Sequence, residues 1–143
     1  MSQVLLYGFF GEDVAQRTFL AHYLKNQYPD TFLEDEEFRW QIKVSRRSQV
    51  DAFLPAALLQ KAKLGLDVLF VGRDTDTSHH PAVLDLRKQF SATCKNHQSV
   101  VLMLPVQCIE HWFWYIKRKR EDPGKRTPLE TFSRTEAKRA IYG

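Results

Sequence analysis

The sequence predicts a single three-layer α/β domain with a mostly parallel four-stranded sheet. Short apolar runs alternate along the chain with longer segments whose apolar residues recur at helical spacing. This alternation is typical of parallel sheets that carry helices on both faces. The chain has 143 residues, of which 43% are hydrophobic, and a chain of this length can bury one substantial core.

Four short segments are expected to form the strands. Three of them are almost wholly apolar, as expected for strands buried on both faces. The remaining one alternates apolar and polar residues, which is the pattern of a half-buried strand. The expected strands span residues 4–10, 38–45, 67–72 and 99–104.

Five further segments are expected to be helical. Apolar residues recur at helical spacing in the first, and Pro29 closes it. In the second, Ser48 is a candidate cap, Gly65 lies just past the end, and Pro55 indicates a kink or a later start. The third has a proline in its first turn. The expected helices span residues 13–28, 49–64, 81–90, 106–119 and 134–142.

Composition disfavours several classes of protein. No apolar run approaches the roughly 18 residues of a membrane helix, and the N-terminus lacks the basic region and cleavage pattern of a secretory signal. Cys94 and Cys108 are too few for a disulfide scaffold or a four-thiolate zinc site. The glycines form no phosphate-binding loop. We therefore expect a cytoplasmic protein that does not itself bind ATP or a membrane.

The positive charge of the chain is concentrated near its end. The net charge is +4, and residues 115–143 contain nine Lys and Arg against four acids. A basic segment on a near-neutral body indicates an anionic partner, first of all nucleic acid, although a solvated basic helix fits equally well. We expect one domain over residues 1–143, with a basic helical extension at about 117–143.

Acidic residues follow three of the expected strands. Glu12 and Asp13 follow the first, Asp74 and Asp76 the third, and Glu110 lies just after the fourth. The carboxyl ends of parallel strands meet at one edge of a sheet, where ligands bind. Carboxylates gathered there repel one another unless a cation lies among them, and oxygen ligands favour Mg²⁺ or Mn²⁺.

Each acid also has an ordinary structural interpretation. Glu12 and Asp13 can cap a helix and occupy its first turn. Asp74 and Asp76 can be loop acids, and Glu110 can be an exposed residue of a first helical turn. Only their occurrence at three strand ends favours a shared metal site.

The order of these acids resembles a toprim domain, a Rossmann-like fold. The chain reads EDVAQRTFL from Glu12, DTD from Asp74, IEHW from Ile109 and AKR from Ala137. These segments are similar to the E-G-x-T-E-x-x-F-L, D-x-D, (F/I)-E-x-W and late-lysine motifs of two groups of proteins. One is the nuclease part of overcoming-lysogenization-defect (OLD) proteins, and the other is the RloB-type defence proteins.

The resemblance implies metal-dependent cleavage of phosphodiester bonds in nucleic acid. It implies that Glu12, Asp74, Asp76 and Glu110 bind Mg²⁺ (or Mn²⁺), with Glu12 also able to take a proton from the attacking water. Lys138 would offset charge on the phosphorus. The resemblance further implies a role in antiviral defence, with a separate ABC-type ATPase subunit. Oligomeric state is left open.

A basic run in the last long helix is expected to hold the DNA or RNA backbone. Contacts of this kind are sensitive to salt and indifferent to sequence. The run consists of Lys117, Arg118, Lys119 and Arg120.

Two departures from the toprim pattern leave alternatives open. Asp13 replaces the motif's glycine, and Gln16 replaces its second acid, which in nuclease members helps to hold a second metal. A degenerate, non-catalytic toprim module that binds nucleic acid or a partner protein is therefore the second interpretation. A receiver-like regulator or another doubly wound enzyme is the third. The Asp74–Asp76 spacing and the basic segment fit a receiver poorly.

Three further signals are given little weight. Adjacent histidines such as His79 and His80 rarely chelate one ion. Cys108 with His111 hints at a thiol nucleophile, without an identifiable orienting group. The four aromatics at 112–115 cannot all face one side of a helix. At least two are expected in the core, with stacking on bases the less favoured alternative.

Overall fold

A computed structural model describes residues 3–12, 14–41, 47–126, 128–129 and 131–143. The chain divides into two compact units. The first contains Met1–Arg73 and Gln89–Met103, and the second contains Asp74–Lys88 and Leu104–Gly143. The expectation of one domain with a basic extension stays a prediction.

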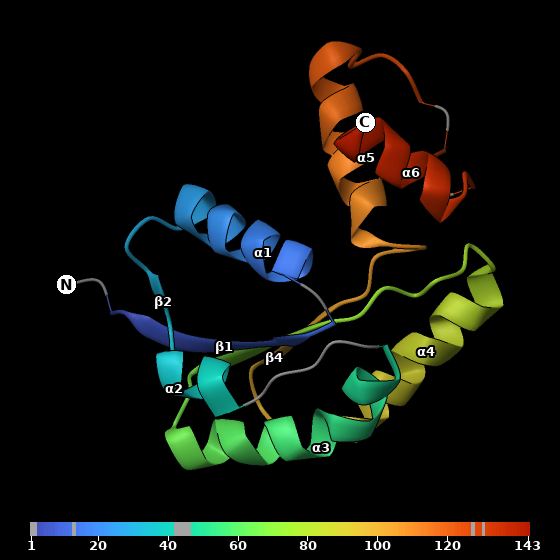
Figure 1. The fold of residues 1–143 in the computed structure, drawn as a ribbon. Helices are drawn as coiled ribbons and strands as arrows, with labels where there is room; N and C mark the ends of the chain where they lie inside the picture. The colour runs from blue at the N-terminus through green and yellow to red at the C-terminus, as the bar shows by residue number, and fades with distance from the viewer. Residues whose placement is uncertain (1–2, 13, 42–46, 127, 130) are drawn as a thin grey trace. The chain divides into compact units, whose positions relative to one another are not determined.

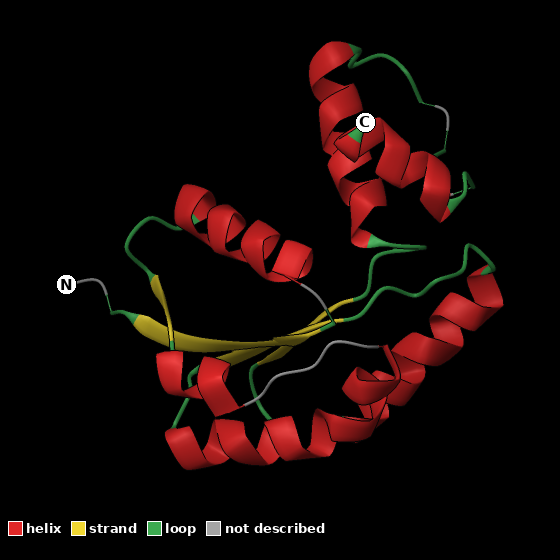
Figure 2. Ribbon diagram, in the orientation of Figure 1, coloured by secondary structure: helices red, strands yellow, loops and turns green. Residues whose placement is uncertain are grey.

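A four-stranded, all-parallel sheet forms the centre of the first unit (Figure 2). Its strand order is β2-β1-β3-β4. The register places Tyr7 opposite Val68 and Gly11 opposite Gly72, so β1 and β3 end together. The strands are β1 (Leu5–Gly11), β2 (Phe32–Glu34), β3 (Val68–Gly72) and β4 (Val100–Met103).

Helices cover both faces of this sheet and complete the three layers (Figure 1). Helix α1 (Val14–Gln27) lies on one face, and α2 (Glu36–Gln41) and α3 (Arg47–Leu64) lie on the other. The buried residues of α1 include Leu20 and Leu24, four residues apart on one helical face. The predicted α/β class with a parallel four-stranded sheet is confirmed.

The predicted strand at residues 38–45 is wrong. Phe38 lies in helix α2, and residues 42–46 lie outside the described part of the chain. The side chain of Asp35 accepts a hydrogen bond from Phe38 N at 2.9 Å, which caps α2. Phe38 is fully buried, and a Cβ added at Gly8 of β1 would lie 2.8 Å from its ring. The second strand is instead the three-residue β2, paired with β1.

The ends of three other elements differ from the sequence predictions. Helix α3 begins at Arg47 and contains Pro55, so Ser48 lies inside the first turn. Helix α4 (His80–Thr93) extends beyond its expected end and contributes residues to both units. Helix α5 (Ile109–Glu121) begins three residues late because Gln107 is left-handed (φ 68°) and Cys108 is extended.

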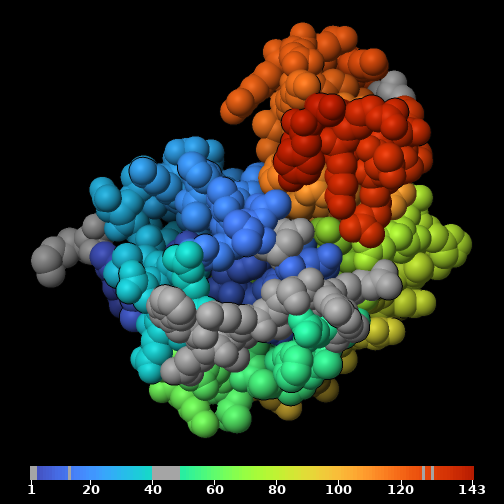
Figure 3. Space-filling view, in the orientation of Figure 1, coloured from blue at the N-terminus to red at the C-terminus, as the bar shows by residue number. Residues whose placement is uncertain are grey.

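Helices α5 and α6 (Arg134–Tyr142) pack together in the second unit (Figure 3). Ser133 caps α6, since its Oγ accepts from Glu136 N at 3.1 Å. Ala137 is fully buried, and Lys117 Nζ donates to Ala140 O at 3.0 Å. No helix among the described residues has the length and apolar character required to cross a membrane.

Candidate functional site

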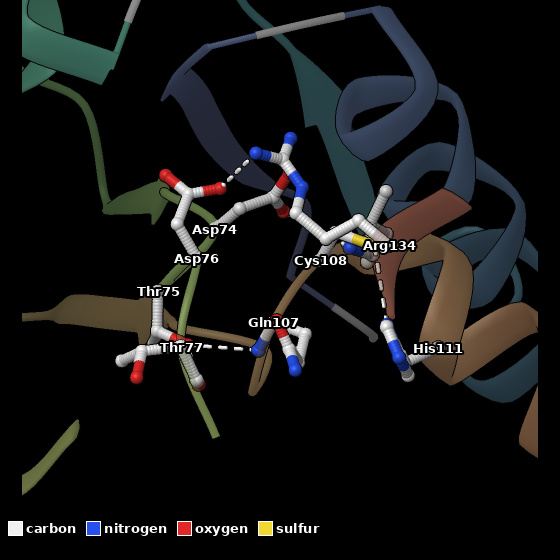
Figure 4. A network of polar contacts seen from close by, with 9 residues as sticks. Asp74, Thr75, Asp76, Thr77, Gln107, Cys108, His111 and Arg134 are labelled. Carbon is white, nitrogen blue, oxygen red and sulfur yellow. Dashed lines mark hydrogen bonds and ion pairs between the residues drawn. The ribbon is translucent and has the colours of Figure 1, made fainter. Parts of the chain in front are cut away.

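Two chain segments of the second unit run side by side and position its acids. Thr75 N donates to Pro105 O at 3.1 Å, and Asp76 N donates to Gln107 O at 2.8 Å. Thr75 Oγ1 accepts from Gln107 N at 2.9 Å (Figure 4). Asp76 (φ 59°) and Gln107 (φ 68°) are both left-handed, a conformation that costs energy for residues other than glycine. These hydrogen bonds hold both residues in it.

Asp74 is attached to the start of helix α5. Its side chain is almost wholly buried, and its Oδ1 accepts from Ile109 N at 3.0 Å. The N-cap residue of α5, Cys108, makes no capping bond with its own side chain. Asp74 therefore supplies the cap from another segment, and the positive end of the helix dipole stabilises its negative charge.

Glu110 lies in the first turn of the same helix and is 4% exposed. Its Oε2 accepts from the hydroxyl of Tyr142, in the last turn of α6, at 3.1 Å. This contact ties the beginning of α5 to the end of α6.

Asp76 forms an ion pair with Arg134, the first residue of α6. Arg134 Nη1 lies 2.6 Å from Asp76 Oδ1, an ion pair without the alignment of a hydrogen bond. In Figure 4 the guanidinium is directed toward Asp76, with Asp74 beside it. Burial favours a lower pKa for Arg134, but the charges of Asp76 and Asp74 outweigh it and raise that pKa. A permanent cation therefore lies beside both acids.

Cys108 is a buried structural thiol. Burial, followed by the charges of Glu110 and Asp74, raises its pKa to about 11. Its Sγ lies 3.2 Å from His111 Nδ1, and His111 Nε2 lies 2.9 Å from Phe132 O. Because a carbonyl only accepts, Nε2 carries the proton and Nδ1 accepts from the thiol. At neutral pH the thiol is protonated, which does not favour a nucleophilic role.

Three of the five predicted catalytic residues lie in the second unit, where each has a partner on helix α5 or α6. Asp74, Asp76 and Glu110 belong to the second unit, where Asp74 and Glu110 meet at the start of α5 and Asp76 joins them through Arg134. Lys138 is exposed on α6, one helical turn after Arg134. The nucleic-acid-binding candidates 117–120 lie in the second half of α5.

Glu12 belongs to the first unit, so its convergence with the other acids stays a prediction. Its backbone N donates to Gln16 Oε1 at 3.2 Å. Gln16 is fully buried beside Gly11 and Gly72, where an added Cβ would lie 2.8 or 2.7 Å from Gln16 Oε1. The amide that replaces the motif's second acid therefore packs against the ends of β1 and β3. Asp13, the other departure, lies outside the described residues.

The chemistry of the three acids fits Mg²⁺, since all are oxygen donors. Their present arrangement gives each a protein partner: Asp74 caps α5, Asp76 pairs with Arg134, and Glu110 bonds to Tyr142. Among the described residues, no three or more His, Cys, Asp or Glu side chains are grouped to hold a metal ion. The oxygen atoms of these three acids are therefore suitable ligands for Mg²⁺. In the structure, the positive charge beside Asp74 and Asp76 is that of Arg134.

Sequence reasoning missed Arg134 and Tyr142. One signal was present for Arg134, because a cation in the first turn of a helix is disfavoured by the helix dipole. Arg134 directly follows the Ser133 cap and is therefore in the first turn of α6. A cation in that unfavourable position indicates an acidic partner elsewhere in the chain. No local pattern indicated the contact of Tyr142 with Glu110, 32 residues earlier in the chain.

Comparisons of the chain with models of protein families, with curated proteins and with solved structures found no match. The toprim resemblance therefore stays a prediction from the motifs. The candidate function depends on the chemistry of the residues described above.

Proposed function

We propose that the chain is a toprim-type, Mg²⁺-dependent nuclease or nuclease-like subunit that cleaves phosphodiester bonds in nucleic acid. The local charge balance around the three acids of the second unit carries this proposal. Asp74 and Glu110 are buried and the side chain of Asp76 is 10% exposed, and buried carboxylates require compensating charge. Arg134 contributes one positive charge and the start of α5 about half of one. With all three acids ionised, more than one negative charge remains, which favours a divalent cation.

Each residue then has a defined role. Asp74, Asp76 and Glu110 would hold Mg²⁺, which supplies Lewis-acid stabilisation of phosphate oxygens when bound. Glu12 would join them or take the proton of the attacking water. Lys138, one turn from Arg134 on α6, would offset negative charge that develops on the phosphoryl group.

The basic run of α5 would provide the affinity for the substrate. The four residues of the run, 117–120, are consecutive cationic side chains on the helix that begins at Ile109. Phosphate contacts of this kind bind DNA and RNA without reading sequence. The resemblance alone supports a role in antiviral defence beside a separate ATPase. The cytoplasmic location is inferred from the N-terminal sequence and the cysteine content.

A non-catalytic module that binds nucleic acid or a partner protein is the second candidate. Two observations favour it: Arg134 pairs with Asp76, and Gln16 is a packed amide in place of an acid. In such a module Arg134 would replace the metal permanently. The basic run of α5 would then bind a strand that the protein does not cut.

Cleavage assays separate the two candidates. The purified protein is incubated with supercoiled plasmid, single-stranded DNA or RNA, in Mg²⁺, Mn²⁺ or EDTA. Asp74→Asn is the informative variant, because the amide oxygen can still accept from Ile109 N while the charge is lost. Asp85→Asn, at an exposed position of α4, is the matched control.

The nuclease proposal expects cleavage that requires the metal, disappears in Asp74→Asn and persists in Asp85→Asn. Cleavage that survives Asp74→Asn would place the active site elsewhere. Salt-sensitive binding of nucleic acid with no cleavage of any substrate would favour the non-catalytic module.

A further inference from the structure

A cavity separate from the acids lies in the second unit, along the later turns of α5 and the segment that leads to α6. Its volume is about 360 Å³, which lies in the range of pockets that bind small molecules. Asp74, Asp76 and Glu110 do not line it. Apart from Leu129, the residues that line it fall into three chemical groups, each on a described part of the chain.

The first group is aromatic. Trp114 and Phe132 line the cavity with ring centroids 5.4 Å apart and planes inclined at 47°. Phe132 is 37% exposed, so it presents part of its ring. Its backbone is fixed, since Phe132 O lies 2.9 Å from His111 Nε2 and Phe132 N donates to Leu129 O at 3.0 Å. The face of either ring provides a flat surface on which a planar base can stack.

The second group is cationic. Lys117, Arg118 and Lys125 line the same cavity. Lys117 Nζ donates to Ala140 O at 3.0 Å, a bond that uses one of the three N–H donors of the ammonium group and fixes its position. Three cations at one cavity favour an anionic group such as phosphate.

The third group is acidic. Glu121 and Asp122 line the cavity beside the cations. These carboxylates disfavour a ligand that is purely polyanionic, because they would repel it. They accept hydrogen bonds from hydroxyl groups, and carboxylates are used in this way to bind the hydroxyls of ribose. The three groups match the three parts of a ribonucleotide. The aromatic rings suit the base, the carboxylates suit the ribose hydroxyls, and the cations suit the phosphate.

We propose that this α5 cavity binds one ribonucleotide, with its base on Trp114 and Phe132. Glu121 and Asp122 accept from the ribose hydroxyls, and the cations bind the phosphate. The inference rests on the proposed function, since it takes nucleic acid as the partner and selects RNA over DNA. The same chemistry is present in a free ribonucleoside monophosphate and at the end of an RNA strand.

Calorimetric titration with AMP, dAMP and short RNA and DNA strands, all in EDTA, tests the proposal without reference to cleavage. We expect AMP to bind about tenfold more tightly than dAMP, because the deoxy ligand leaves a carboxylate unpaired. Glu121→Gln should bring that ratio close to one. Lys125→Gln should weaken AMP about fivefold, and Phe132→Leu at least fivefold. Lys95→Gln, exposed and outside the cavity, should change nothing.

Competition between AMP and the RNA strand shows whether the ligand is a free nucleotide or the end of an RNA strand. If AMP displaces the RNA strand, the cavity takes the end of RNA. If AMP binds and RNA does not, it takes the free nucleotide. Equal affinity for AMP and dAMP, no binding of AMP or RNA, or binding indifferent to Lys125→Gln and Glu121→Gln would overturn the proposal.

The two proposals fail separately. Metal-dependent cleavage lost in Asp74→Asn, with binding of both AMP and RNA unaffected by the cavity variants, refutes the cavity and keeps the nuclease. Binding of RNA that depends on the cavity, with no cleavage, keeps the cavity and refutes the nuclease.

Discussion

Removal of the positive charge of Arg134 is expected to destabilise the second unit and to strengthen metal binding by its acids. Arg134→Gln breaks the 2.6 Å ion pair with Asp76 and removes the cation beside Asp74. The two carboxylates then lose the positive charge that both of them face. A divalent cation that binds them faces no competing guanidinium.

The magnitude follows from the burial of the pair. Loss of one partner costs about 3–5 kcal/mol in a buried pair and about 0–1 kcal/mol in an exposed one. The side chain of Asp76 is 10% exposed and that of Arg134 is 39% exposed, so the pair lies between these limits. We expect the free energy of unfolding to fall by about 2 kcal/mol in Arg134→Gln.

Urea denaturation measures both effects. Arg139→Gln, exposed on the same helix, is the control and should change the free energy of unfolding by less than about 0.5 kcal/mol. A double-mutant cycle with Asp76→Asn isolates the pair. At a hundred times the variant's dissociation constant, Mn²⁺ should stabilise Arg134→Gln by about 2.7 kcal/mol. The same concentration should stabilise the wild type less. Equal effects of the two arginine variants, or equal stabilisation by Mn²⁺, would refute the reasoning.

Three further predictions concern other parts of the chain. Gly72→Ala should lower the free energy of unfolding by about 1–3 kcal/mol, because the added Cβ would lie 2.7 Å from Gln16 Oε1. Thermal denaturation followed by circular dichroism measures the effect, and an unchanged melting temperature would contradict it. Because burial raises the pKa of Cys108 to about 11 from its ordinary 9.0, the unfolded thiol ionises first and stability should fall as pH rises from about 9 to about 11. Urea denaturation across that range should show a shallower fall in Cys108→Ala, and parallel profiles would contradict the assignment. Lys119→Gln with Arg120→Gln should weaken binding to duplex DNA and reduce the slope of log affinity against log salt by about 0.9 for each phosphate that is no longer neutralised; fluorescence anisotropy measures the slope, and an unchanged slope would exclude a role for these two residues in binding phosphate.

The sheet could be predicted from the sequence because its signal is local. Strands β1, β3 and β4 are apolar runs, and a buried parallel strand requires little else. Strand β2 has only three residues, FLE, too short for a recognisable pattern. The segment from Phe38 was misread because its apolar residues alternate, although Asp35 followed by Glu36 and Glu37 is a helix-start signal. In that segment the cap and the packing of Phe38 on Gly8 decide the structure.

Part of the candidate site could also be predicted. The rule that ligands bind past the carboxyl ends of parallel strands led to Asp74, Asp76 and Glu110, all three of which belong to the second unit. Their partners could not be predicted, because Arg134 and Tyr142 reach the acids through the packing of α6 on α5. Packing between helices depends on side chains distant in sequence, which composition and periodicity do not encode.

Calorimetric titration of the protein with Mn²⁺ tests most directly whether the acids of the second unit form a divalent-metal site. The measurement compares the wild type with Asp74→Asn and with Asp85→Asn. We predict one class of site that is lost in Asp74→Asn and retained in Asp85→Asn. Absence of binding in the wild type, or binding unchanged in Asp74→Asn, would contradict the assignment. Arg134 would then be the cation that neutralises these acids.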